Sequence, residues 1–160
     1  MGLKLTNACG EPEALRPLFR EYTDMILENV PSFRAYLDLQ HYDDELAHLD
    51  HKYGPPEGRL YLARWDGAAA GCAGFRKLDE TRCELKRLYV RPAFRDHQIG
   101  ERLLRQLMDD ARAAGYRHML LDTLPFLGSA LRLYRRFGFH EIPRYNDSPL
   151  AETIYLGLDL

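Results

Sequence analysis

The first half of the chain begins with apolar residues at helical spacing and continues with the alternating apolar and polar residues of β-strands. Apolar side chains recur every three or four positions over residues 13–29, which predicts an amphipathic helix that Pro31 ends. A shorter helix is expected over residues 43–52. Four strands are expected in this half, at residues 4–6, 59–65, 70–77 and 83–90. Asp66-Gly67 between two of these strands predicts a tight hairpin turn.

The second half is more helical and begins with the clearest helix of the chain. Residues 100–114 carry an apolar stripe, and Gly115 is expected to end the helix; the stripe consists of Leu103, Leu104, Leu107, Met108 and Ala111. A buried strand is expected at residues 118–123 and a short helix from Ser129, as its cap, to Phe137. Closing strands are expected at residues 139–142 and 153–158. This order predicts a mixed α/β fold with helices packed on a sheet.

Composition narrows the class of protein. The 160 residues show no linker or repeat, which predicts a single domain over residues 1–160. The net charge of −2 gives no reason to expect nucleic acid or an anionic membrane as a partner. No run of about 18 apolar residues occurs, and the N-terminus lacks a signal-peptide pattern. With three widely spaced cysteines that do not suggest a disulfide framework, a cytoplasmic location is expected.

The segment over residues 88–100 has the pattern of an anion site. It runs from a predicted strand through a polar turn directly into the first turn of the long helix. The first N–H groups of a helix have no partners within the helix and lie at the positive end of its dipole. The segment has only one glycine, Gly100, and no Gly-Lys-Ser/Thr occurs in the chain, which excludes a dinucleotide fingerprint and a Walker loop.

Two motifs in this half resemble the GNAT N-acetyltransferase superfamily. The first is Val90-x-Pro92-x-x-Arg95-x-x-Gln98-x-Gly100, and the second is the run from Leu133-Tyr134 to Gly138-Phe139. The resemblance covers residues 83–139 and implies a central mixed, mostly antiparallel sheet flanked by helices. The chain departs from the family pattern at two positions: Gln98 replaces a loop glycine, and Leu127 stands where many members have Asn.

The resemblance implies acetyl-CoA as co-substrate and direct transfer of its acetyl group to an amine of a small molecule or peptide. The backbone of Leu88, Tyr89 and Val90 is expected to pair with the pantetheine arm and to polarise the thioester carbonyl. The pyrophosphate is expected on the loop and first helical turn, comprising Arg95, Asp96, His97, Gln98, Ile99, Gly100, Glu101 and Arg102, the last two through their main-chain N–H groups. Family members often form homodimers, so a homodimer is one expectation.

Two residues are candidates for proton transfer. Glu84 is the candidate base for the amine, and strand alternation predicts that it shares a face with Lys86, Leu88 and Val90. The alternative for Glu84 is an exposed strand carboxylate paired with a neighbouring cation. Tyr134 stands where the family places its general acid, and a tyrosine with a pKa near ~10 is protonated at neutral pH. Its alternative role is that of a core aromatic side chain.

Residues at the end of the strand at 118–123, and a tyrosine further along the chain, are candidates for the acceptor site. Asp122, Thr123 and Tyr145 are expected to border it. Five acidic residues between Tyr36 and Tyr53 favour a cationic acceptor, or else form an ordinary solvated face. His48 and His51 share a predicted helix face, but their spacing matches no metal motif, so no metal is expected.

Two rival functions use the same segment. A non-catalytic module that binds acyl-CoA would bind the cofactor without turning it over. A nucleotide-binding regulator would use the same helix N-terminus and bind ATP or NAD as well as CoA.

Overall fold

The computed structural model describes residues 2–160 and contains a seven-stranded sheet in the order β1-β2-β3-β4-β5-β7-β6. The strands are β1 (Leu3–Asn7), β2 (Arg59–Trp65), β3 (Ala68–Lys77), β4 (Arg82–Val90), β5 (His118–Thr123), β6 (His140–Glu141) and β7 (Ile154–Asp159). β4 and β5 pair in parallel, and the other neighbours pair antiparallel. The expected mixed, mostly antiparallel sheet is confirmed.

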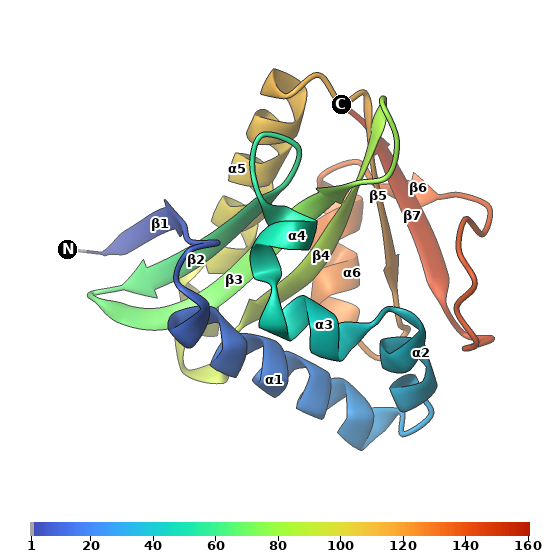
Figure 1. The fold of residues 1–160 in the computed structure, drawn as a ribbon, viewed down its shortest axis with the longest axis horizontal. Helices are drawn as coiled ribbons and strands as arrows, with labels where there is room; N and C mark the ends of the chain where they lie inside the picture. The colour runs from blue at the N-terminus through green and yellow to red at the C-terminus, as the bar shows by residue number, and fades with distance from the viewer. Residues whose placement is uncertain (1) are drawn as a thin grey trace.

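Helices cover both faces of this sheet, as Figure 1 shows. The helices are α1 (Pro12–Asn29), α2 (Phe33–Leu39), α3 (Tyr42–Ala47), α4 (Leu49–Tyr53), α5 (Ile99–Ala113) and α6 (Gly128–Arg136), with a 3₁₀ turn at Pro92–His97. α1 to α4 lie on one face and α5 and α6 on the other. Each face has its own apolar core, so both sides of the central strands are buried. Within residues 2–160, no helix is both long and apolar enough to cross a membrane.

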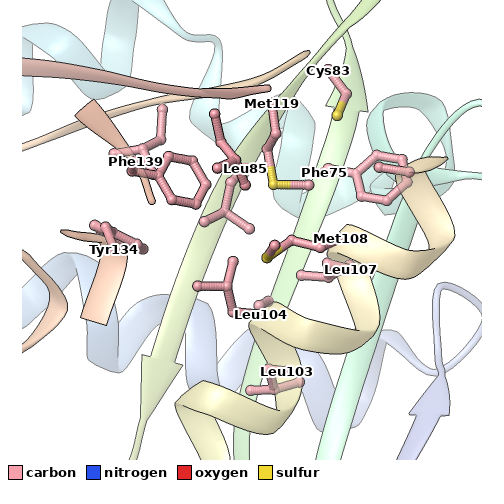
Figure 2. Packing of buried hydrophobic residues seen from close by; sticks show 14 of the residues in the cluster. Phe75, Cys83, Leu85, Leu103, Leu104, Leu107, Met108, Met119, Tyr134 and Phe139 are labelled. Carbon is pink, nitrogen blue, oxygen red and sulfur yellow. The ribbon is translucent and has the colours of Figure 1, made fainter. Parts of the chain in front are cut away.

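The predicted stripe of α5 forms the centre of one core. Leu103, Leu104 and Leu107 are fully buried, and Figure 2 shows Leu104 and Leu107 on the side of α5 that faces Leu85 and Phe75 of the sheet. Burial of a leucine side chain stabilises the fold by roughly 1.5–3 kcal/mol, so this stripe holds α5 at a fixed place on the sheet. The helix that begins at the candidate anion site is therefore firmly anchored.

The local turn signals of the sequence are also confirmed. Asp66 and Gly67 both have positive φ, 48° and 88°, as a type I′ hairpin requires. Gly115 and Gly138 follow the ends of α5 and α6 with φ of 95° and 99°. Glycine adopts this left-handed conformation at no steric cost, which explains why the helices end there.

The expected single helix over residues 43–52 is wrong, because the chain breaks at His48 into α3 and α4. The carbonyl groups of Leu46 and Ala47, which a continuous helix would use, instead accept hydrogen bonds from Arg16 of α1 at 2.7 and 3.5 Å. The Arg16 side chain, 30 residues away in the sequence, thus provides hydrogen bonds to the carbonyl groups at the end of α3. The sequence analysis also missed α2, whose seven residues are too few for a clear periodic signal.

The start of α6 differs from the prediction as well. The helix begins at Gly128 after Leu127, and no side chain caps it. Ser129 lies inside the helix, where its hydroxyl accepts a hydrogen bond from Arg132 at 3.2 Å instead of capping a backbone N–H.

β4 and β5 stay together for only a short distance. Their pairing covers Arg82 to Glu84 on one strand and His118 to Leu120 on the other. Beyond it the two strands diverge, as Figure 1 shows. The candidate site lies where they separate.

Candidate functional site

A β-bulge in β4 determines which side chains face the candidate site. Cys72 pairs with Tyr89 but Gly74 pairs with Lys86, so β4 contains an extra residue between these pairs. Arg87 lies in this bulge with a φ of 60°. Leu88 and Val90 therefore pack in the core on the α5 face, whereas Tyr89 packs in the α1 core. The prediction that Glu84 shares a strand face with Leu88 and Val90 is wrong. The extra residue in the bulge moves the side chains that follow it to the opposite face of the sheet.

The same strand has an open edge toward β5. From Leu85 to Val90, no residue of the described chain pairs with β4 on that side, while β3 pairs on the other. N–H and carbonyl groups along such an edge are available to an extended ligand that contains amides. Leu88, Tyr89 and Val90, the residues expected to pair with the pantetheine arm, lie on this segment.

The N-terminus of α5 presents free backbone donors. Gln98 precedes the helix in the left-handed conformation with a φ of 57°, and no side chain caps the helix. Ile99, Gly100 and Glu101 are the first three residues of the helix, so their N–H groups have no helical acceptor. The prediction that the main-chain N–H of Arg102 binds the pyrophosphate is wrong, because this N–H donates to the Gln98 carbonyl at 3.1 Å. Arg102 reaches a ligand only through its exposed side chain.

Gln98 takes the backbone conformation that a glycine would adopt freely. The left-handed region costs a non-glycine residue roughly 1–2 kcal/mol. The anchoring of α5 in the core maintains the loop geometry in spite of that cost. Gln98 thus holds the left-handed conformation without the steric freedom of a glycine.

The side chains of the preceding loop mostly point outward. Asp96 is exposed, and Arg95 folds back to donate to the Val90 carbonyl at 3.0 Å. The ring of His97 stacks on Trp65 with the centroids 3.9 Å apart. Ile99 has its side chain in the core and contributes only backbone to the surface. These contacts shape a loop whose backbone, rather than its side chains, faces the helix N-terminus.

An inner cavity of about 40 Å³, as we name it, lies where β4 and β5 diverge. Tyr134 of α6 lines it and packs against Phe139 at 5.6 Å; Figure 2 shows the two side by side. Burial raises the pKa of the Tyr134 hydroxyl well above its ordinary value. The hydroxyl remains protonated at neutral pH, and no residue in the described part of the chain hydrogen-bonds to it. Leu127 also lines this cavity, where it presents an apolar side chain.

Asp122 and Thr123 reach the same cavity from the end of β5. Asp122 accepts hydrogen bonds through one oxygen from Tyr36 of α2 and, at 2.7 Å, from Asn146. Burial and the neighbouring Asp122 carboxylate raise the pKa of Tyr36 strongly, so this tyrosine is a proton donor. Thr123 is buried.

Glu84 lies at the edge of the site in a set of ionic and polar contacts. It is 1% exposed, and its two oxygens accept from Arg76 at 2.8 Å and from Tyr145 at 2.5 Å. The Lys86 ammonium is 3.8 Å from one of these oxygens. Burial alone would raise the pKa of Glu84, but Lys86, Arg76 and the Tyr145 hydroxyl outweigh it and lower the pKa to about 2. The alternative interpretation of Glu84 is therefore wrong about its exposure, because the carboxylate is buried, and right that it pairs with neighbouring cations.

A second buried carboxylate supports the bulge. Glu45 of α3 accepts from Arg87 at 2.8 and 2.9 Å, from Lys52 at 2.7 Å and from Tyr53 at 2.8 Å. Burial would raise the pKa of Glu45, but Arg87 and Lys52 lower it well below its usual range. Of the five acidic residues between Tyr36 and Tyr53, Glu45 is thus neutralised by cations, and the others are exposed: Asp38, Asp43, Asp44 and Asp50.

An outer cavity, as we name it, opens beneath α2, α3 and α4 and is larger. Glu84, Arg76 and Asn146 line it, and so do three residues that also line the inner cavity: Tyr36, Gln40 and Lys86. These three side chains therefore lie at the boundary between the two cavities. His48 and His51 also line the outer cavity, and their rings stack at 4.7 Å. Among residues 2–160, no three metal-binding side chains are grouped around a common point.

The structure brings most of the expected site residues together. Tyr134, Asp122 and Thr123 share the inner cavity, and Tyr145 contacts Glu84 directly. The sequence analysis missed Tyr36 and Gln40, because α2 was not predicted, and it missed Arg76, which β3 places opposite Glu84. Phe33, Tyr36 and Leu37 do have helical spacing, and this was the available signal for α2.

Comparison with known proteins gives consistent matches. The chain matches the acetyltransferase (GNAT) family over residues 17–139. An uncharacterised N-acetyltransferase of Schizosaccharomyces pombe is 37% identical over 142 residues, covering 88% of this chain and 87% of the relative. An IAA acetyltransferase of Azospirillum brasilense is 40% identical over 135 residues, covering 80% of this chain and 87% of the relative.

Among solved structures, PaiA N-acetyltransferase from Thermoplasma acidophilum, in complex with coenzyme A, has a TM-score of 0.75. The match covers 100% of both chains at 15% sequence identity. The two proteins therefore share one fold along their whole length, in spite of their distant sequences.

Proposed function

Because this chain belongs to the acetyltransferase (GNAT) family, we propose that it transfers an acetyl group from acetyl-CoA directly to an amine of a small molecule or peptide. The amine nitrogen attacks the thioester carbonyl carbon, a C–N bond forms and the C–S bond breaks. The amine loses one proton, and the CoA sulfur leaves as a thiolate that takes up a proton. Both substrates bind before the chemistry, without an acetylated enzyme.

The observation that carries this proposal is the protonated tyrosine in the inner cavity. Tyr134 lines the space between the open edge of β4 and the end of β5, and its hydroxyl has no partner in the described chain. A thiol has a pKa near ~8.5, below that of the tyrosine, so Tyr134 stays protonated and donates a hydrogen bond that stabilises the departing thiolate, which takes up its proton from solvent. This geometry favours stabilisation of the leaving group over a purely structural tyrosine.

The donor would be held mainly by backbone groups. The open edge of Leu88, Tyr89 and Val90 suits the amides of the pantetheine arm, and one N–H there can polarise the thioester carbonyl. The free N–H groups at the start of α5 suit the pyrophosphate. Exposed arginines beside them, including Arg102, add positive charge.

Proton removal from the amine is assigned to Glu84 acting through water. An alkylammonium group has a pKa near ~10.4, so direct transfer to a carboxylate of pKa about 2 is steeply uphill. A chain of hydrogen bonds ending at Glu84 lowers that cost, because the negative charge stabilises positive charge developing on the intervening water. Tyr145, bonded to Glu84 at 2.5 Å, holds the carboxylate in place for this role.

Acetyl transfer can be tested by following thiol release from acetyl-CoA across a panel of amines, with the product identified by mass. We expect amine-dependent thiol release in wild type and a loss of about 10²–10⁴-fold in kcat in Tyr134→Phe, with acetyl-CoA affinity retained. Tyr61→Phe is the matched control, since that hydroxyl donates to Asp110 of α5 and neither residue lines either cavity. Binding of acetyl-CoA without turnover of any amine would instead favour the non-catalytic module, and full activity in Tyr134→Phe would remove this role of Tyr134.

A further inference from the structure

The junction of the two cavities restricts what the acceptor can be. Tyr36, Gln40 and Lys86 line both cavities. If acetyl transfer takes place beside Tyr134 in the inner cavity, an acceptor entering from the wider outer cavity passes these three side chains. Lys86 is the only cation of the three, so its environment determines which acceptor groups are stabilised there.

Lys86 is a buried ammonium with spare donors. It is 8% exposed, and its Nζ donates to Gln40 at 2.6 Å while lying 3.8 Å from the Glu84 carboxylate. An ammonium has three N–H donors, and within residues 2–160 only Gln40 accepts one of them in a hydrogen bond. A buried donor without an acceptor is costly, so an anionic ligand at this point gains an unusually strong contact.

Arg76 is a second cation on the wall of the outer cavity. Its Nε donates to Glu84 at 2.8 Å, and its side chain is 36% exposed. The terminal nitrogens of this guanidinium make no hydrogen bond to any residue from 2 to 160. They form the planar pair of donors that binds a carboxylate through both its oxygens.

The charges below the outer cavity leave an excess of positive charge. Three cations on its lining, Lys52, Arg76 and Lys86, face two buried carboxylates, Glu45 and Glu84, and Arg87 pairs with Glu45 from the side of the inner cavity. The rim carries carboxylates too, but they are exposed and screened by solvent: Asp44, Glu57 and Asp147. A small anion fits the cationic floor, whereas a large polyanion would meet the acidic rim.

We propose that Lys86 and Arg76 form an anion subsite for a carboxylate on the acceptor. The acceptor is then a small molecule with both an amine and a carboxylate, of the amino acid class. This inference rests on the proposed acetyl transfer and specifies its substrate. The floor of the outer cavity takes the carboxylate, and the amine points to the inner cavity.

The amine end of such a molecule also has a complementary partner. Asp122 uses one carboxylate oxygen to accept from Tyr36 and Asn146, and the other has no hydrogen-bond donor within residues 2–160. Asp122 lines the inner cavity together with Tyr134. The cations Lys86 and Arg76 on one side and the Asp122 carboxylate on the other thus match the carboxylate and the ammonium of a zwitterionic acceptor in one orientation.

The experiment compares each protein amino acid with its own α-amide as acceptor, which changes the charge and keeps the side chain. We expect wild-type kcat/KM to be at least tenfold higher for the preferred amino acid than for its amide. Arg76→Gln and Lys86→Gln should each reduce this acid-to-amide ratio at least tenfold, mainly through the KM of the acid. Lys77→Gln is the matched control, because Lys77 also lines the outer cavity but pairs with Glu80 at 2.8 Å, and it should keep the wild-type ratio.

Each alternative outcome has a distinct meaning. Equal use of amino acids and amides by the wild type would overturn the subsite and leave acetyl transfer intact. A ratio unchanged in both variants would also overturn it and would leave these cations as partners of Glu84 only. Transfer to neither series, with thiol release on another amine of the panel, would overturn the subsite alone, whereas no release with any amine, although acetyl-CoA binds, would overturn both proposals. The wild-type comparison requires no variant, so a folding defect in Arg76→Gln cannot obscure the result.

Discussion

Glu84 combines almost complete burial with two cationic neighbours and a tyrosine donor, and these contacts shift its pKa from 4.5 to about 2. A carboxylate whose folded pKa lies below its unfolded value stabilises the fold at pH values above the unfolded pKa. That contribution falls as the pH drops from about 4.5 toward about 2. The residue therefore makes the fold sensitive to acid.

Glu84→Gln should lower stability at pH 7 by about 3–5 kcal/mol, because Arg76 and Lys86 lose their buried partner. When the pH is lowered from 4.5 to 2, the stability of the variant should also decrease less than that of the wild type. Thermal midpoints measured from pH 2.5 to 7 check both effects, with the exposed Glu80→Gln as control. An acid dependence as steep as that of the wild type would contradict this account of Glu84.

The same variant examines the base role by a separate measurement. If Glu84 receives the proton of the amine through water, Glu84→Gln should lower kcat and alter the pH–rate profile of acetyl transfer. An unchanged profile with an unchanged kcat would leave Glu84 with a structural role alone.

Among the elements, α5 contributes both to the hydrophobic core and to the candidate donor site. Its stripe packs into the core, and its first turn presents free N–H groups next to Gly100. A Cβ at Gly100 would lie 3.5 Å from Leu133 and 3.9 Å from Val90, which are ordinary contacts. The protein itself therefore has room for alanine at this position.

Gly100→Ala should raise stability by up to about 1 kcal/mol through helix propensity and at the same time weaken acetyl-CoA binding. Thermal unfolding without ligand and a titration with acetyl-CoA measure the two effects separately. Gly128→Ala, at the start of α6, is a control for helix propensity. Unchanged acetyl-CoA affinity in Gly100→Ala would contradict the placement of the pyrophosphate at this turn.

For the whole molecule, the proposed donor site predicts a selective stabilisation. Acetyl-CoA at one hundred times its dissociation constant should add about 2.7 kcal/mol and raise the Tm by roughly 5–10 °C. ATP and NAD should give much smaller shifts at the same concentration, since they lack the pantetheine arm that would pair with β4. Equal shifts with all three ligands would favour a nucleotide-binding regulator instead.

The features that the sequence by itself determined are those set within a short stretch of chain. The stripe of α5 follows from a 3.6-residue period, the hairpin at Asp66-Gly67 from the positive φ that both positions accept, and the end of α5 from Gly115. The free N–H groups at the start of α5 are of the same kind, because they arise at any helix N-terminus. These predictions needed no knowledge of distant neighbours.

The tertiary structure alone decided the arrangement of charged and polar side chains. Arg87 occupies a bulge whose partner Glu45 is 42 residues away, and this bulge reversed the expected face of Leu88 and Val90. Tyr36 meets Asp122 across 86 residues, and Tyr145 meets Glu84 across 61. Periodicity identifies which face of a strand is buried, but the partner of a buried charge depends on which elements pack against that face. The physical reason is that a buried charge is stabilised by its neighbours in space, which only the folded chain brings together.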